Sequence, residues 1–168
     1  MITCDNINYD DINEDNLRGE GGTIMVNIPV EELVKAAEAA RENAYAPYSK
    51  YKVGAAILTS AGRYYTGCNV ENASYSLTCC AERVALFQAV ANGERSFKAI
   101  AVTAGSEDYC RPCGACLQVL AEFGGTIKVF MANGAGDYLV KTVAELLPEA
   151  FKLDNTDNTL EERWSFEP

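Results

Sequence analysis

The chain alternates between segments whose apolar residues recur at helical spacing and short, continuous apolar runs. After Pro29 the helical spacing predicts an amphipathic helix that ends near Tyr45. Two apolar runs on either side of a Ser-Ala-Gly turn then predict a hairpin, with strands over 53–59 and 64–70. The remaining segments predict helices over about 80–91, 113–123 and 143–147, and strands over about 98–104, 126–132 and 138–141.

This order of elements favours an α/β domain, because strands that alternate with helices form a layered sheet through β-α-β crossovers. A chain of 168 residues, 48% of them hydrophobic, can form one good core but has little material for a second. We therefore expect a single domain over 25–152.

The two ends of the chain lack such patterns. Residues 1–24 are rich in Asn, Asp, Ile and Gly, and we expect them to form a disordered extension. A second hypothesis is that Glu20-Gly21-Gly22 is a translated ribosome-binding sequence and that the protein starts at Met25, which mass spectrometry of the natively expressed protein would decide. Residues 153–168 are expected to be a polar tail.

Composition and charge narrow the function. Asp and Glu outnumber Lys and Arg by 24 to 14, and the net charge of −10 repels a phosphate backbone, so we expect a small, nearly neutral substrate and no nucleic acid partner. No apolar run has the length of a membrane span and no secretory signal is evident, which predicts a cytoplasmic protein without a membrane partner. Seven cysteines, an odd number with C-x-x-C spacing, favour thiol or metal chemistry over a disulfide framework.

The chemistry is carried by Cys80-Ala81-Glu82 and Pro112-Cys113-Gly114-Ala115-Cys116, in a chain without histidine. Both motifs fall at predicted helix starts, where free N–H groups and the helix dipole stabilise thiolates. Cys113 and Cys116 share one face of a first helical turn, and Cys80 supplies a third sulfur. Three thiolates can bind Zn²⁺ and leave its fourth position to a water, whose protons Glu82 can move. The motifs therefore predict a hydrolytic zinc site.

Other interpretations fit the same residues taken alone. Cys110, Cys113 and Cys116 form a C-x-x-C-x-x-C motif, which is also typical of a structural zinc site or an iron-sulfur cluster. Either Cys79 or Cys110 would complete a closed site as a fourth ligand. Glu82 would then do no more than complement the dipole of its helix.

The metal-ligand, x, Glu segment followed by Pro-Cys-x-x-Cys is similar to that of the zinc nucleobase deaminases. The chain resembles a cytidine deaminase of the small homotetrameric type with a three-cysteine zinc site. The similarity runs from about residue 30 to Phe151 and includes 44–50, 53–56, 67–73 and 146–148. It implies a three-layer α-β-α sandwich around a mixed sheet of about five strands, one Zn²⁺ per subunit, and a homotetramer with sites shared between subunits.

The resemblance also implies a role for individual residues. Cys80, Cys113 and Cys116 would bind the metal, Arg83 would neutralise their charge, and Glu82 would be the catalytic proton shuttle. Asn69 and Glu71, which alternation along a strand places on one face, would hydrogen-bond the ribose hydroxyls. The remaining substrate contacts implied are Ala81, Tyr51 near the pyrimidine, and Phe151, which would close the site of a neighbouring subunit.

The activity implied is hydrolytic deamination of cytidine and deoxycytidine to uridine and deoxyuridine, with release of ammonia, in pyrimidine salvage. Tyr51 stands where the family commonly has Phe, and Leu117 where it commonly has Arg, so Arg111 is a candidate to replace the missing charge. These departures keep open a modified substrate, an N4-substituted or blasticidin-like cytosine nucleoside. A noncatalytic zinc-binding scaffold is a further alternative, whereas a nucleic-acid editing deaminase is disfavoured by the acidic composition.

Overall fold

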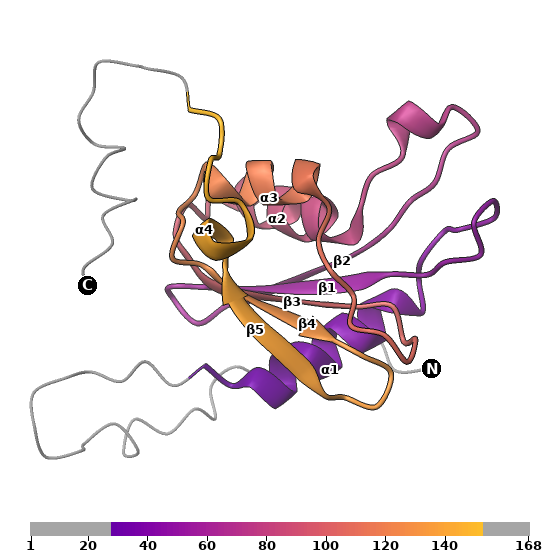
Figure 1. The fold of residues 1–168 in the computed structure, drawn as a ribbon, viewed down its shortest axis with the longest axis horizontal. Helices are drawn as coiled ribbons and strands as arrows, with labels where there is room; N and C mark the ends of the chain where they lie inside the picture. Colours follow the sequence, from indigo (N-terminus) through magenta and orange to yellow (C-terminus); the bar gives the residue numbers. More distant parts are fainter. Residues whose placement is uncertain (1–27, 153–168) are drawn as a thin grey trace, which may run out of the picture.

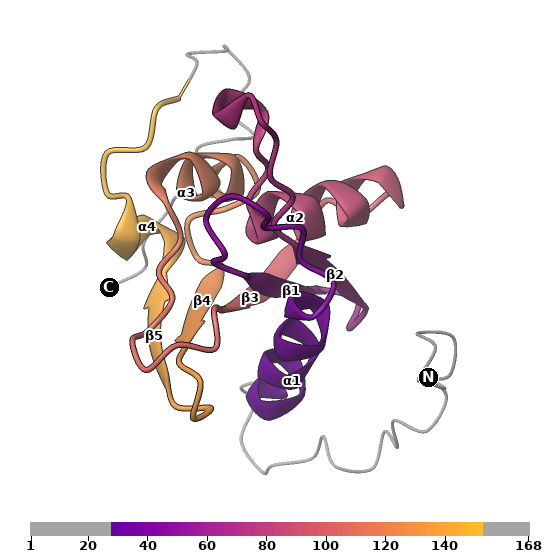
Figure 2. The same ribbon diagram turned by 90° about the vertical axis from the view of Figure 1, so that its right-hand side faces the viewer.

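The computed structural model describes residues 28–152 and contains a five-stranded mixed sheet with helices on both faces (Figures 1 and 2). The strand order is β2-β1-β3-β4-β5, and β3 with β4 is the parallel pair. The predicted α-β-α sandwich is therefore confirmed, while the predictions for 1–24 and 153–168 lie outside the described residues. The elements are α1 (Val30–Arg41), β1 (Gly54–Thr59), β2 (Tyr64–Cys68), a short 3-10 helix (Tyr75–Leu77), α2 (Ala81–Ala91), β3 (Phe97–Thr103), α3 (Gly114–Ala121), β4 (Lys128–Ala132), β5 (Tyr138–Thr142) and α4 (Val143–Leu146).

The central strands are buried on both faces, which explains why they are continuous apolar runs. On one face α1 packs through Leu33 and Ala37 against small residues of β1 and β3. On the other, α2 and α3 bury Leu86 and Leu120 over Ile100. None of the helices in residues 28–152 is long and apolar enough to cross a membrane.

The predicted ends of the first helix and of the second hairpin strand were wrong, and both are explained by hydrogen bonds of the Asn69 backbone. The first helix ends at Arg41 and not near Tyr45, because the Tyr45 N–H donates to the carbonyl of Asn69 at 3.0 Å and so leaves the helical ladder. The second strand of the hairpin ends at Cys68, and Asn69 then donates its own N–H to the Val53 carbonyl. Asn69 and Glu71 therefore follow the strand instead of alternating along it.

A close contact between β2 and α2 fixes where the second helix begins. A Cβ atom at Gly67 would lie 2.4 Å from the Ala85 nitrogen and 2.6 Å from the Ala81 oxygen. Since such distances are far below van der Waals contact, only glycine allows α2 to approach so closely. This contact sets the position of the first turn of α2, which carries the Cys-Ala-Glu motif.

Candidate metal centre and substrate site

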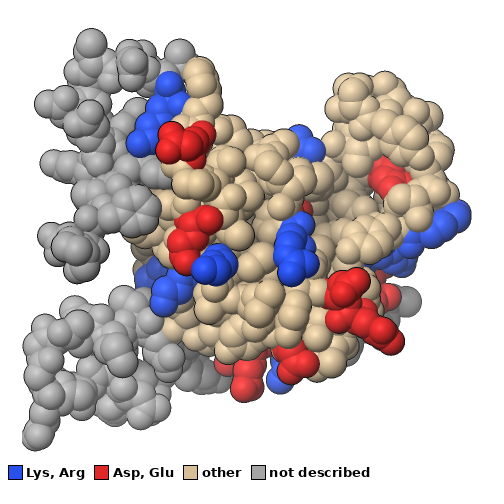
Figure 3. All heavy atoms as spheres, viewed as in Figure 1, with Lys and Arg blue, Asp and Glu red and all other residues tan. Residues whose placement is uncertain are grey.

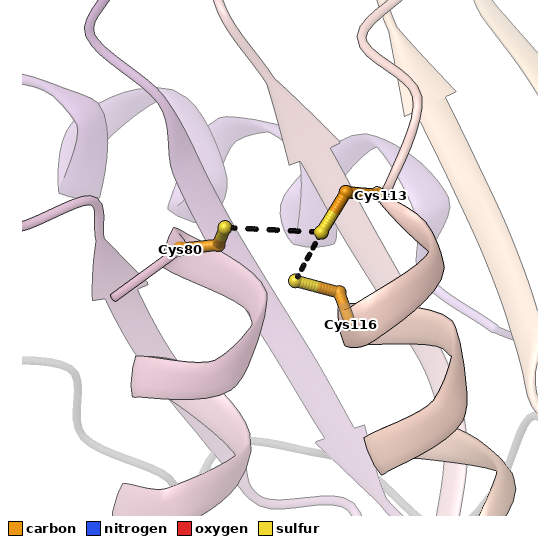
Figure 4. Close-up of side chains that lie close together, drawn as sticks. All are labelled: Cys80, Cys113 and Cys116. Atoms are coloured by element: carbon orange, nitrogen blue, oxygen red, sulfur yellow. Dashed lines mark hydrogen bonds between the residues drawn. The ribbon is translucent and has the colours of Figure 1, made fainter. Parts of the chain in front are cut away.

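The N-termini of α2 and α3 bring three cysteine sulfurs together (Figure 4). Cys80 is the residue that precedes α2, Cys113 precedes α3, and Cys116 lies in the first turn of α3. The Sγ atoms of Cys80 and Cys113 are 4.0 Å apart, those of Cys113 and Cys116 are 3.5 Å apart, and all three lie within 4.8 Å of one another. The structure thus assembles the three predicted ligands from segments 33 residues apart.

The surroundings of the Cys80 sulfur favour a thiolate. A hydrogen bond from the Cys116 thiol and another from Arg83 lower the pKa of Cys80 to about 5. The same contact raises the pKa of Cys116, because its proton is held against the Cys80 sulfur. Three converging sulfurs at two helix N-termini are a donor set that suits zinc with one position left open.

Cys110 is not part of this cluster. Its side chain is buried, and burial raises the pKa of its thiol to about 11. Within residues 28–152, the group of side chains that could hold a metal ion is Cys80, Cys113 and Cys116. The arrangement therefore does not support a closed site or a cluster built on the C-x-x-C-x-x-C motif.

Glu82 lies in the first turn of α2, two residues after the first of these cysteines. Its side chain is buried, with 4% exposed, and this burial raises its pKa above the usual value for a glutamate. A carboxyl group that is easily protonated beside a metal site can accept and return protons near neutral pH. Ala81, directly before it, is fully buried.

The guanidinium of Arg83 contacts the cysteine cluster. Arg83 donates from Nη2 to the Thr78 carbonyl at 3.0 Å and to the Cys80 sulfur at 3.7 Å. Arg111 donates instead to the Tyr109 carbonyl at 3.4 Å, and none of its hydrogen bonds within the described part of the chain reaches a sulfur. Leu117 is buried. The idea that Arg111 replaces the missing charge is thus not supported by the geometry.

Asn69 and Glu71 are both buried, and both hold the loop between α1 and β1. The Asn69 amide accepts from the Val53 N–H at 2.8 Å and donates to the Tyr51 carbonyl at 2.9 Å. The Glu71 carboxylate accepts from the N–H of Tyr48 at 2.9 Å, and from the N–H and the hydroxyl of Ser49. These bonds, that of the Ser49 hydroxyl first, hold the pKa of Glu71 below its usual value.

Sequence reasoning did not find Ser49 as a partner of Glu71. The two residues are 22 positions apart, and the only local signal was the turn around Pro47. Lys50, which follows, has a positive φ of 60°, uncommon for a residue with a side chain. The loop is thus held in a defined conformation by the two buried polar residues beneath it.

The two predicted aromatic contacts are both exposed in the single chain. Tyr51 is 50% exposed, and its hydroxyl contacts the Cys110 thiol and Ser106; burial and this thiol raise its pKa. Phe151 is 70% exposed, while its backbone is bound by the side chain of Gln118. Gln118 was not predicted to matter, and no motif other than its position two residues after Cys116 singles it out.

Known proteins with the same features are cytidine deaminases. The family model described as the cytidine and deoxycytidylate deaminase zinc-binding region matches residues 29–133. A cytidine deaminase from Sporosarcina psychrophila is 52% identical over 134 residues, which cover 79% of this chain and 98% of that protein. Another from Halalkalibacterium halodurans is 50% identical over 127 residues, covering 75% and 96%.

Solved structures agree with these sequence matches. The crystal structure of cytidine deaminase from Burkholderia pseudomallei has a TM-score of 0.69 and 54% identity, and the match covers 71% of this chain and 97% of that one. The structure of the enzyme from Mycobacterium leprae has a TM-score of 0.65 and 42% identity, covering 73% and 100%. The chain therefore belongs to the family of zinc-binding cytidine and deoxycytidylate deaminases.

Proposed function

We propose that the protein catalyses the hydrolytic deamination of cytidine and deoxycytidine to uridine and deoxyuridine, with release of ammonia, as a step of pyrimidine salvage. The observation that carries the proposal is the buried Glu82 beside three sulfurs that converge within 4.8 Å. A noncatalytic scaffold has no use for a buried carboxyl group in that place, because burying a charge without a partner is costly.

The proposed reaction is a proton relay through one carboxyl group. Cys80, Cys113 and Cys116 would hold zinc, which would lower the pKa of a water and so supply the nucleophile. Glu82 accepts a proton from this water and delivers it to N3 of the pyrimidine while oxygen bonds to C4. The same carboxyl group then passes the second proton to the exocyclic amine, the C4–N bond breaks, ammonia leaves, and uridine remains. Arg83 would hold negative charge on the Cys80 sulfur throughout.

Recognition of the nucleoside is assigned to the residues around the α1–β1 loop. Asn69 and Glu71 would hydrogen-bond the ribose hydroxyls in addition to the loop. This is possible because each carboxylate oxygen can accept more than one hydrogen bond. Ala81 and Tyr51 would contact the pyrimidine. The Tyr51 hydroxyl, turned to Cys110 and Ser106, allows a different fit from that of a phenylalanine, which keeps the modified cytosine nucleoside as an alternative substrate.

The exposed Phe151 supports an assembly in which subunits complete one another's sites. We infer a homotetramer in which this ring closes the site of a neighbouring subunit, with one zinc ion per subunit. Light scattering on the purified protein tests the assembly. Mixed oligomers of Glu82→Gln and Phe151→Leu chains test the sharing, because a subunit with an intact Glu82 would then meet an intact Phe151 from its neighbour and recover wild-type KM.

Charge and cysteine state support a small substrate and a cytoplasmic location. On the face shown in Figure 3, basic side chains are scattered among acidic ones and form no continuous tract for a polynucleotide. The six cysteines within residues 28–152 are all free thiols, a state that a reducing compartment maintains.

The deciding experiment measures uridine and ammonia formed from cytidine by the zinc-loaded protein and by Glu82→Gln. We expect turnover by the wild type and a loss of at least about a hundredfold in kcat in the variant, with zinc content and melting temperature retained. Equal activity of the two proteins would remove Glu82 from the mechanism. A wild type that binds zinc but leaves cytidine unchanged would favour a modified nucleoside or a scaffold, and N4-substituted cytidines would then be assayed next.

A further inference from the structure

Gln118 of helix α3 binds the backbone of Phe151, in the segment that follows α4. Gln118 donates from Nε2 to the carbonyl of Phe151 at 2.8 Å and accepts from the Phe151 N–H through Oε1 at 2.9 Å. Both hydrogen-bonding groups of one amide therefore bind both backbone groups of one residue 33 positions later. In Figures 1 and 2 this segment leaves α4 and runs beside α3, the helix that carries Cys116 two residues before Gln118.

The pairing fixes the backbone of Phe151 but leaves its side chain uncovered. Two hydrogen bonds, one to the N–H and one to the carbonyl of the same residue, define its position and orientation, as a hydrogen-bonded pair does in an antiparallel sheet. Ala150, immediately before, packs against the main hydrophobic core, so the segment is also held from below. The Phe151 ring is nevertheless 70% exposed. Gln118 thus sets the direction in which the Phe151 ring projects from the protein surface.

Such an arrangement is costly unless the ring has a use. Ordering a backbone segment opposes its conformational entropy, and a phenylalanine ring that stays 70% exposed gains little from burial in its own chain. We propose that Gln118 is a positioning residue, which holds Phe151 so that helix α3 of one subunit directs an aromatic contact into the substrate site of another. This inference rests on the role given to Phe151 in the proposed function.

The alternative is that Gln118 only fastens the C-terminal segment and contributes to stability. The two cases differ in whether the effect of a Gln118 substitution on KM depends on the Phe151 ring. A positioning residue acts on substrate binding through Phe151, so its effect disappears once the ring is removed. A fastening residue lowers the melting temperature without changing KM, or changes KM by the same factor whether or not the ring is present.

A double-mutant cycle separates the two cases. The variants are Gln118→Met, which is similar in size but has neither amide group, Phe151→Leu, and the two combined. We expect Gln118→Met to raise KM for cytidine by about threefold to tenfold with kcat nearly unchanged, and to add nothing in the Phe151→Leu background. Gln118→Glu keeps the acceptor for the Phe151 N–H and loses the donor, so it should fall between wild type and Gln118→Met. Gln88→Met, the same change at an exposed position of α2, is the matched control.

A second readout does not depend on activity. Hydrogen exchange of the Phe151 amide should be faster in Gln118→Met and unchanged in Gln88→Met, with zinc content equal in all variants. Unchanged exchange would show that the pairing does not hold the segment and would overturn the proposal.

The kinetic outcomes also distinguish this proposal from the one on which it rests. Faster exchange together with a KM effect that multiplies that of Phe151→Leu would overturn the positioning role and leave the function intact. If Phe151→Leu itself leaves KM unchanged, the aromatic contact is wrong and Gln118 has nothing to position, although cytidine turnover stands. A wild type inactive on cytidine would instead reject the proposed function and, with it, this inference.

Discussion

Val70 and Cys79 form an isolated antiparallel bridge in which the Val70 N–H donates to the Cys79 carbonyl at 2.9 Å and the Cys79 N–H donates back at 3.0 Å. Val70 lies between Asn69 and Glu71, and Cys79 directly precedes Cys80. This pair of backbone hydrogen bonds therefore fixes the segment assigned to ribose binding against the residue that precedes Cys80. The two hydrogen bonds of such a bridge allow little shift in register. We therefore expect that a displacement of the segment around Val70 would also displace the segment around Cys79.

The first prediction separates a ribose contact at Glu71 from its support of the loop. Glu71→Gln keeps an acceptor for the Tyr48 and Ser49 N–H groups but loses the charge. We expect KM for cytidine to rise by about tenfold, because hydrogen bonds to charged groups are stronger than neutral ones. The measurement compares cytidine with 2′,3′-dideoxycytidine, which lacks both ring hydroxyls and should show little change.

Ser49→Ala serves as the control for this prediction. It removes the hydroxyl bond to Glu71 and the one that Ser49 Oγ accepts from the Tyr51 N–H, and leaves the carboxylate charged. Loosening of the loop should affect both nucleosides equally. An equal rise in KM for the two nucleosides with Glu71→Gln would therefore assign that residue to the loop alone.

Part of the metal group was predictable because its geometry is local. The first turn of a helix places residues three apart on one face, so the pairing of Cys113 with Cys116 followed from their spacing at the start of α3. Cys80, 33 positions before Cys113, was predicted from its motif at another helix start and not from spacing. The place of Glu82 in the first turn of α2 was predicted from the same helix start, whereas its burial was not predicted.

The loop contacts were not predictable, because they join residues far apart in sequence. Tyr48 and Ser49 bind Glu71 across 23 and 22 positions, and Gln118 binds Phe151 across 33. No helical or strand period relates such pairs. The end of α1 was misplaced for the same reason, since the Tyr45 N–H bonds to a distant carbonyl that propensity within the segment does not reveal.

A second prediction concerns removal of the metal. Three cysteine sulfurs brought together at two helix N-termini form a zinc site only in the folded chain, so zinc should stabilise the fold by about 2.7 kcal/mol at a free concentration a hundredfold above Kd. Chelation should lower the melting temperature and abolish turnover, and added zinc should restore both. Cys113→Ser is the control, since it removes one exposed ligand. The same zinc-dependent shift in that variant would exclude Cys113 from the site.

A third prediction tests the close packing of β2 against α2. Gly67→Ala places a methyl group against the Ala81 carbonyl and the Ala85 nitrogen, both of which are backbone atoms that cannot rotate away. We expect a loss of about 1–3 kcal/mol in the free energy of unfolding, and a lower kcat because the displaced turn carries Glu82. Urea denaturation and steady-state kinetics measure the two effects. Thr66→Ala, on the exposed side of the same strand, should change neither, and a Gly67→Ala protein of wild-type stability would contradict the packing argument.

A fourth prediction concerns a buried acid remote from the metal group. Glu94 is 7% exposed, and it accepts a hydrogen bond from Arg63 Nε at 2.5 Å and another from the Tyr65 hydroxyl at 3.2 Å. The bond from Arg63 lowers the pKa of Glu94 below its usual value. A carboxyl group whose pKa is lower in the folded than in the unfolded chain stabilises the fold above the unfolded pKa, about 4.3 for glutamate. That stabilisation is lost as the pH falls through the folded pKa.

Glu94→Gln should therefore be less stable than the wild type at pH 7, and the difference should shrink as the pH falls below about 4. Urea denaturation of both proteins between neutral and acidic pH measures it. Glu107→Gln, a change at an exposed position, provides the comparison and should follow the wild type throughout. A difference that stays constant with pH would show that Glu94 contributes through packing rather than through its charge, because only the ionised carboxylate gains from the guanidinium of Arg63.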